Sequence, residues 1–204
     1  MKVYRIPFST NVERVALALG HKGIEVEWVE VDPRDRSEVV RVSGQELVPV
    51  LVDGDRVVVD SMEIVRDLEE RHPARPLYPG DPAARAELGI FIDWFNRVWK
   101  RAPNGIEGEL RKRRPNRALI ETLGAKIEAA LDLFEDLLDG RSHLWGDDFS
   151  AADIAAFPFL KYATRWDEGD DERFHEILRD WQGLGDGYPR LRAWIDRVDA
   201  RARA

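Results

Sequence analysis

The residues with the clearest chemical meaning are Val48 and Pro49, within the apolar run from Leu47 to Val52. Proline has no N–H to donate to a strand ladder and is confined to strand starts, edges and bulges. Its position ahead of a hydrophobic hairpin favours a cis Val48–Pro49 bond, the minority form of X-Pro bonds. A cis bond would turn the N–H and C=O of Val48 outward, where an extended peptide can pair with them. We therefore expect a peptide-recognition site at Val48.

Cysteine is absent from the 204 residues, which excludes disulfides, thiolate metal ligands and a protein thiol as nucleophile. Any sulfur chemistry therefore needs a thiol on the substrate. The histidines show no metal-ligand spacing, and the chain contains no Gly-x-Ser-x-Gly motif. We expect neither a metal site nor a serine hydrolase.

The overall charge limits the partners. A net charge of −8 argues against binding to nucleic acid or to an anionic membrane, because both require a basic face. The basic run Arg111–Arg114 follows acidic Glu107 and Glu109, and we expect it to be a solvated helix end or loop. No apolar run approaches the roughly 18 residues of a membrane span, and the first residues lack the pattern of a secretory signal. The expected compartment is the cytoplasm.

The elements that would hold Val48 follow from local patterns in the first third of the chain. A strand over 2–6, a helix that begins near Thr10 or Asn11, and a strand over 24–31 predict a βαβ unit with parallel strands. A weaker helix is expected over 35–42. Asp53-Gly54-Asp55 predicts a hairpin between strands over 50–52 and 57–59. Asp60 or Ser61 then caps a further helix. Together these elements predict an α/β domain.

The remainder of the chain carries only helical patterns. Prolines between Pro73 and Pro82 indicate a connector between domains. Beyond it, two amphipathic stripes run over 88–99 and 123–138. Ser150 and Asp153 predict the start of a helix that is apolar all round and therefore buried, and Pro189 opens a last helix. We expect an α/β domain over 1–74, a linker over 75–82 and an all-helical domain over 83–204.

An α/β domain of thioredoxin type followed by an all-helical domain resembles the cytosolic glutathione S-transferases, and the resemblance covers essentially the whole chain. Local motifs carry it. Ser9-Thr10-Asn11-Val12-Glu13-Arg14-Val15 is similar to the first-helix entry of the serine-type classes, above all phi, and Gln45-Glu46-Leu47-Val48-Pro49 is similar to the zeta-like form of the proline loop. Asp60-Ser61 is similar to the acid-serine pair of the family, and Phe149–Ala155 to the capping motif of its helical domain.

The resemblance implies a glutathione transferase in which Ser9 is the catalytic residue. A free thiol has a pKa of about 8.5, so only a few per cent is thiolate near neutral pH. A hydroxyl donor at Ser9, together with the positive end of the helix that follows it, would stabilise the thiolate. The serine would act as a hydrogen-bond donor and not as a nucleophile. Glutathione would be a co-substrate, with no cofactor required.

The resemblance also implies which residues bind the substrates. Those expected to bind glutathione are Asn11, Gln45, Val48, Pro49, Asp60 and Ser61, with Asp60-Ser61 at the γ-glutamyl end and Gln45 nearest the glycyl end. The second substrate would be a small hydrophobic electrophile, and its pocket is expected to include Trp94, Arg97, Trp99, Tyr162 and Trp166. The family further implies a homodimer and a role in detoxification.

Several alternatives stay open. Ser9, Asp60 and Ser61 are of residue types that commonly cap helices, so each could serve only as a helix cap. Arg14 is expected to be a structural ion-pair or dimer-contact residue. The zeta-like proline loop also fits a glutathione-dependent cis-trans isomerase. Glu46 places a negative charge in a loop that would face an anionic peptide, which fits a non-catalytic binding module with the same fold.

Overall fold

Strand β1 (Lys2–Arg5) lies inside a four-stranded sheet of order β2-β1-β3-β4. It pairs in parallel with β2 (Glu27–Glu30), which confirms the predicted βαβ unit. On its other side β1 pairs antiparallel with β3 (Val50–Asp53), and β3 forms the predicted hairpin with β4 (Arg56–Val59). Gly54 turns this hairpin with a φ of 60°, which suits a residue without a Cβ. The strand after Pro49 is thus interior to the sheet.

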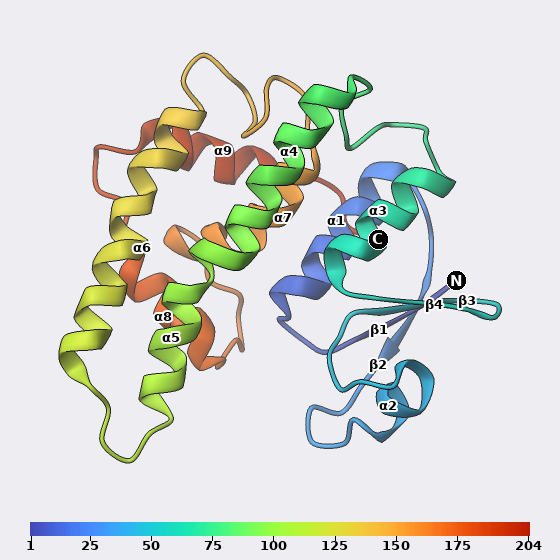
Figure 1. Cartoon of the computed structure of the whole chain (residues 1–204), viewed down its shortest axis with the longest axis horizontal. Coiled ribbons are helices and arrows are strands. Elements are labelled where there is room, and N and C mark those ends of the chain that lie inside the picture. The colour runs from blue at the N-terminus through green and yellow to red at the C-terminus, as the bar shows by residue number, and fades with distance from the viewer. The chain divides into compact units, whose positions relative to one another are not determined.

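Helices cover both faces of this sheet (Figure 1). Helix α1 (Thr10–Lys22) and helix α3 (Ser61–Arg71) pack against each other on one face, and α2 (Ser37–Ser43) lies on the other. The strands alternate accordingly, because successive side chains point to opposite faces. Val3 and Leu51, which are register partners, are both fully buried. Their neighbours Tyr4 and Val50 join Val39 of α2 in a second buried cluster.

The computed structural model describes residues 1–204 and divides into two compact units. One comprises Met1–Tyr78 together with Arg201–Ala204, and the other comprises Pro79–Ala200. The division falls within the predicted linker 75–82. The last four residues nevertheless belong with the α/β unit, which the pattern of the sequence did not indicate.

The second unit is entirely helical. Its elements are α4 (Pro82–Trp94), a π-helical segment η1 (Phe95–Trp99), α5 (Arg101–Leu110), α6 (Arg117–Leu137), α7 (Ala151–Leu160), a 3-10 turn η2 (Lys161–Ala163), α8 (Arg173–Trp181) and α9 (Pro189–Asp199). Figure 1 labels the helices in this order. The mixed sheet followed by a helical unit is the fold class expected from the sequence. No helix is both long and apolar enough to cross a membrane.

The π-helical segment changes which residues of the first stripe are buried. The N–H of Lys100 bonds to the carbonyl of Phe95, five residues earlier, at 3.1 Å. The wider turn rotates the helix surface, so Phe95 and Trp99 are both buried and stack at 4.5 Å between ring centroids. Val98, which the helical periodicity placed in the same stripe, is 52% exposed. Its predicted core position is wrong for this reason.

Helix α7 is the buried centre of the helical unit. All ten of its residues are buried, as its uniformly apolar sequence predicted. Ser150 and Asp153 form the predicted capping box at its start. Helix α9 begins at Pro189, also as predicted. Helix α8, whose buried residues are His175, Ile177 and Leu178, was not predicted from the sequence.

Candidate functional site

A cavity of about 360 Å³ lies within the α/β unit, beside the starts of α1 and α3. It is lined by Asn11, Gln45, Leu47, Val48, Pro49, Val59, Asp60 and Ser61. The structure therefore brings together every residue that the sequence suggested for binding glutathione. Leu47 and Val59 also line the cavity, although the sequence did not suggest them. Both are exposed apolar side chains, at 74% and 38%, and their surroundings gave no functional signal in the sequence.

The loop before β3 presents the backbone of Val48 to this cavity. The Val48–Pro49 peptide bond is cis, as expected. No hydrogen bond within the chain involves the backbone N–H or C=O of Val48. The side chain of Gln45 holds the loop, because its Nε2 donates to the Leu47 carbonyl at 2.7 Å and its Oε1 accepts from the Leu47 N–H at 2.5 Å. Gln45 therefore braces the loop, and one N–H and one oxygen lone pair of its amide are used in doing so.

Asp60 and Ser61 form the start of α3. Asp60 is the N-cap, and its Oδ1 accepts from the N–H groups of Met62 at 2.8 Å and Glu63 at 3.3 Å. Its φ of 68° is uncommon for a non-glycine residue, and such backbone strain concentrates at functional sites. Ser61 is buried at the first position of the helix, where backbone N–H groups favour a carboxylate. The pair offers one anionic group and one anion-binding group side by side.

A buried arginine supports this pair from within the unit. Arg14 on α1 is 2% exposed, and its Nη1 donates to Ser61 Oγ and to Asn11 Oδ1, both at 3.3 Å. Burial lowers the pKa of the guanidinium to about 9, while the nearby charge of Asp60 opposes that shift. Arg14 is still a cation at neutral pH, so it adds positive charge behind Ser61. Since Ser61 Oγ accepts from Arg14, its own proton is free to be donated into the cavity.

Ser9 caps α1 at the edge of this group of residues. Its Oγ accepts from the N–H of Val12 at 3.3 Å, so the hydroxyl proton points elsewhere. Ser9 is half-buried and does not itself line the cavity, although Asn11, two residues later, does. The preceding Phe8 has a φ of 58°. Both serines of the site thus follow a non-glycine residue with left-handed φ.

The residues suggested for the electrophile pocket do not share one cavity within the helical unit. Trp99 and Tyr162 are buried, at 5% and 1% exposure. The hydroxyl of Tyr162 bonds to Asp170 and to His175, each at 3.0 Å. Trp94 lines an apolar cavity of about 490 Å³ with Glu87, Ile90, Phe91, Leu133, Leu137 and Trp145. The exposed members of the set are Arg97, which pairs with Asp93, and Trp166, which carries Arg179 over its ring.

Metal-ligating side chains do not gather in the structure. No group of three or more His, Cys, Asp or Glu residues has the geometry to hold a metal ion. The α/β cavity offers hydrogen-bond donors and a carboxylate, with the buried cation Arg14 behind Ser61.

Two family models match the chain. The glutathione S-transferase N-terminal domain matches residues 3–76, and the glutathione S-transferase C-terminal domain matches residues 117–197. A glutathione S-transferase of Triticum aestivum is 27% identical over 94% of this chain and 90% of its own length. A solved glutathione S-transferase from Rhodospirillum rubrum F11 is 28% identical, with a TM-score of 0.74 over 98% of this chain and 88% of its own.

The chain belongs to the glutathione S-transferase family. The class of enzyme expected from the sequence, a glutathione transferase, is thereby confirmed. A different kind of relative also matches: a stringent starvation protein A homolog of Pasteurella multocida is 28% identical over 92% of this chain and 80% of its own length.

Proposed function

We propose that the α/β cavity binds glutathione and that the hydroxyl of Ser9 activates the glutathione thiol for addition to a small hydrophobic electrophile. The observation that carries the proposal is the cavity itself, in which the free backbone of Val48 lies with Asp60 and Ser61. This combination suits a short peptide that ends in an amino acid headgroup. No protein cysteine or metal cluster is needed for that chemistry.

The charges in the cavity match the γ-glutamyl end of glutathione. Its α-carboxylate fits the N-terminus of α3, where the Ser61 hydroxyl and the Arg14 guanidinium add to the helix dipole. Its α-amino group fits the Asp60 carboxylate. The cysteinyl backbone then pairs with Val48 in a strand-like fashion. Gln45 contributes by bracing the loop, and Pro49 and Asn11 complete the walls.

In this proposal the Ser9 hydroxyl lowers the pKa of the glutathione thiol. Lowering a thiol pKa by two units requires roughly 2.7 kcal/mol of preferential stabilisation of the thiolate. A charge-assisted hydrogen bond from the Ser9 hydroxyl supplies about 1.5 to 3 kcal/mol, and the N-terminus of α1 adds a fraction of this. Ser9 caps α1 through its oxygen, which leaves its proton for this bond.

The remaining parts of the proposal come from the family. The electrophile is small and hydrophobic, and Trp94, Arg97, Trp99, Tyr162 and Trp166 are the residues proposed to form its pocket. Of these, Trp99 and Tyr162 would act from buried positions, by shaping the helices around it. We further propose a cytoplasmic homodimer that conjugates electrophiles in detoxification.

Replacing Ser61 by alanine should weaken glutathione binding about tenfold, because the carboxylate loses one hydrogen bond of about 1.5 kcal/mol. Isothermal titration calorimetry with glutathione measures the effect, and Ser37→Ala on the surface of α2 is the control. Wild-type protein that does not bind glutathione at millimolar concentration would refute the enzyme proposal.

Replacing Arg14 by methionine should cost both stability and glutathione binding. A neutral outcome is known where a whole buried ion pair is replaced, whereas removing one member leaves its partners unmatched. Ser61 Oγ and Asn11 Oδ1 each lose a donor, so we expect a loss of about 1–3 kcal/mol in the free energy of unfolding and at least about tenfold weaker glutathione binding. Urea denaturation and isothermal titration calorimetry measure the two effects. A folded variant that binds glutathione with wild-type affinity would show that Arg14 does not support the site.

A non-catalytic binding module is the second candidate function. Its support is the likeness to the stringent starvation protein A homolog, together with the exposed Glu46 in the loop that braces Val48. Both functions are compatible with glutathione binding, so the conjugation rate separates them. A glutathione-dependent isomerase is distinguished by the isomerisation of a maleyl substrate.

A further inference from the structure

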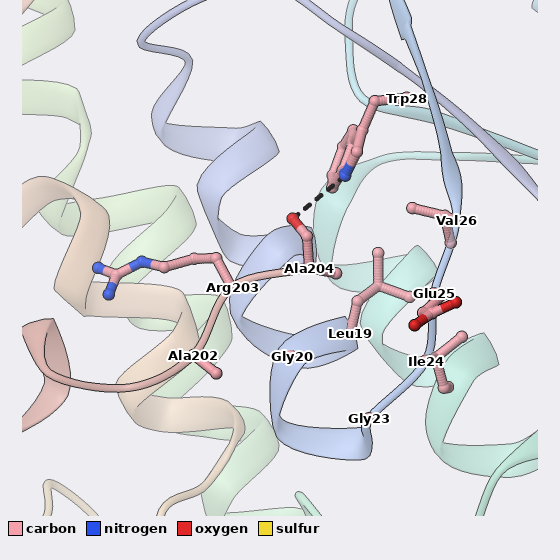
Figure 2. A pocket seen from close by; sticks show the side chains of 10 residues that line it. All are labelled: Leu19, Gly20, Gly23, Ile24, Glu25, Val26, Trp28, Ala202, Arg203 and Ala204. Carbon is pink, nitrogen blue, oxygen red and sulfur yellow. Dashed lines mark hydrogen bonds between the residues drawn. The ribbon is translucent and has the colours of Figure 1, made fainter.

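The last four residues of the chain lie along α1 and β2 of the α/β unit (Figure 2). The N–H of Ala204 donates to the carbonyl of Ala16 at 3.2 Å, and Trp28 Nε1 donates to the carbonyl of Ala204 at 3.1 Å. A side chain of this segment, Arg203, reaches the first turn of α1. There its Nη2 lies 2.9 Å from Glu13 Oε1. A segment far away in the sequence is thus fixed to the helix that begins at Ser9.

Gly20 allows the last four residues to pack closely against α1. A Cβ at position 20 would lie 2.2 Å from the carbonyl oxygen of Ala202 and 2.9 Å from the Cα of Arg203. Both are backbone atoms, so any side chain at position 20 must push the segment away. The segment also borders a cavity of about 430 Å³, whose lining residues Figure 2 shows. It can therefore shift without opening the sheet.

The pairing of Arg203 with Glu13 matters because of where Glu13 lies. Its backbone N–H bonds to the carbonyl of Ser9 at 2.9 Å, so the two residues are one helical turn apart. Glu13 therefore lies in the first turn of α1, which Ser9 caps, and its negative charge disfavours a second anion nearby. The side chains of Glu13 and Arg203 are only 17% and 27% exposed, so solvent screens their charges incompletely.

We propose that Arg203, carried to α1 by Arg201–Ala204, neutralises Glu13 and thereby protects the thiolate that forms at Ser9. Arg203 is thus a positioning residue for the proposed reaction, acting through Glu13, and Gly20 is the residue that makes its approach possible. The inference rests on the proposed function of Ser9.

Other charged groups also lie along α1. The side chain of Arg14 donates to Asn11 and Ser61, and burial lowers the pKa of its guanidinium while the charge of Asp60 opposes that shift. Towards the other end of the helix, burial and the adjacent Arg201 lower the pKa of His21. Glu13 forms an ion pair with Arg203 at 2.9 Å.

The test is the pKa of the bound glutathione thiol in a double-mutant cycle of Arg203→Gln and Glu13→Gln. That pKa is read from the ultraviolet absorbance of the bound thiolate and from the pH profile of kcat/KM with a chlorodinitrobenzene. Removing Arg203 should raise this pKa by about half a unit and lower kcat/KM about threefold at pH values below the pKa, because the Glu13 carboxylate then loses its ion pair with Arg203. In the Glu13→Gln background the same change should have no effect.

Gly20→Ala should reproduce the effect of Arg203→Gln, and the two together should do no more than either alone. The matched control is Gly89→Ala in α4, where an added Cβ meets nothing within 4 Å. Ser9→Ala separates the two proposals, since it should raise the thiol pKa by more than one unit. A shift with Ser9→Ala but none with Arg203→Gln overturns the inference and leaves the proposed function standing. No shift with Ser9→Ala overturns both.

Discussion

Replacing Ser9 by alanine should lower kcat/KM for glutathione conjugation roughly 10- to 30-fold at neutral pH. Without the hydroxyl, the pKa of the bound thiol returns towards about 8.5, and the thiolate fraction falls in proportion. Raising the pH should restore most of the rate, because the thiol then ionises without help. The pH profile of kcat/KM measures both effects in one experiment.

Matched variants separate the catalytic role of Ser9 from its role as a helix cap. The N-cap bond to Val12 contributes about 1 kcal/mol, so Ser9→Ala should also lower the free energy of unfolding by about that amount. Ser9→Asp keeps a capping oxygen but has no proton to donate, and it should be stable yet at least as impaired. Ser9→Thr keeps both functions. If the alanine variant conjugates at the wild-type rate, Ser9 is only a cap.

The parts of the site that depend on local sequence were predictable. The cis bond before Pro49, the N-cap at Asp60 and the capping box at Ser150 each follow from residues within a few positions of one another. Local hydrogen-bonding and backbone preferences decide such features, and neighbouring residues report them. The cavity follows as well, since βαβ handedness and a hairpin bring these short segments to one end of the sheet.

Features that depend on distant contacts were not predictable from the pattern. Arg14 was expected to be a structural ion-pair or dimer-contact residue, and its hydrogen bond to Ser61, 47 residues away in the sequence, was not predicted. Arg203 meets Glu13 across 190 residues. No periodicity carries such information, because pairing over this range is set by how whole elements pack. Gly20 did hint at a close contact, because a glycine inside a helix is destabilising unless packing requires it.

Helical periodicity also fails to separate core residues from cavity residues. The same spacing buries Trp99 on Phe95 and leaves Trp94 at the wall of a cavity. Tyr162 illustrates a further limit. Its hydroxyl is satisfied within the helical unit by Asp170 and His175, which lie in a loop and in the unpredicted helix α8. The partner that decides the role of an aromatic residue was thus outside the predicted elements.

Replacing Asp153 by alanine should be the most destabilising single substitution, with a loss of about 3–5 kcal/mol in the free energy of unfolding. The carboxylate is fully buried and accepts from the N–H groups of Leu144 at 3.0 Å and Ser150 at 2.8 Å, from Ser150 Oγ at 3.1 Å, and from Trp194 Nε1 at 2.7 Å. Alanine leaves all these buried donors without an acceptor. Denaturant titration followed by circular dichroism measures the loss.

Graded variants test whether these hydrogen bonds, and not the volume of the side chain, hold α7 in place. Asp153→Asn keeps the volume but turns an amide donor towards Ser150, so it should lose about half as much stability as alanine. Trp194→Phe removes a single donor and should cost less than either. Asp148→Ala, at an exposed position in the same loop, should stay within about 0.5 kcal/mol of wild type. Equal losses for Asp153→Asn and Asp148→Ala would contradict the argument, because the helix would then owe its stability to apolar burial alone.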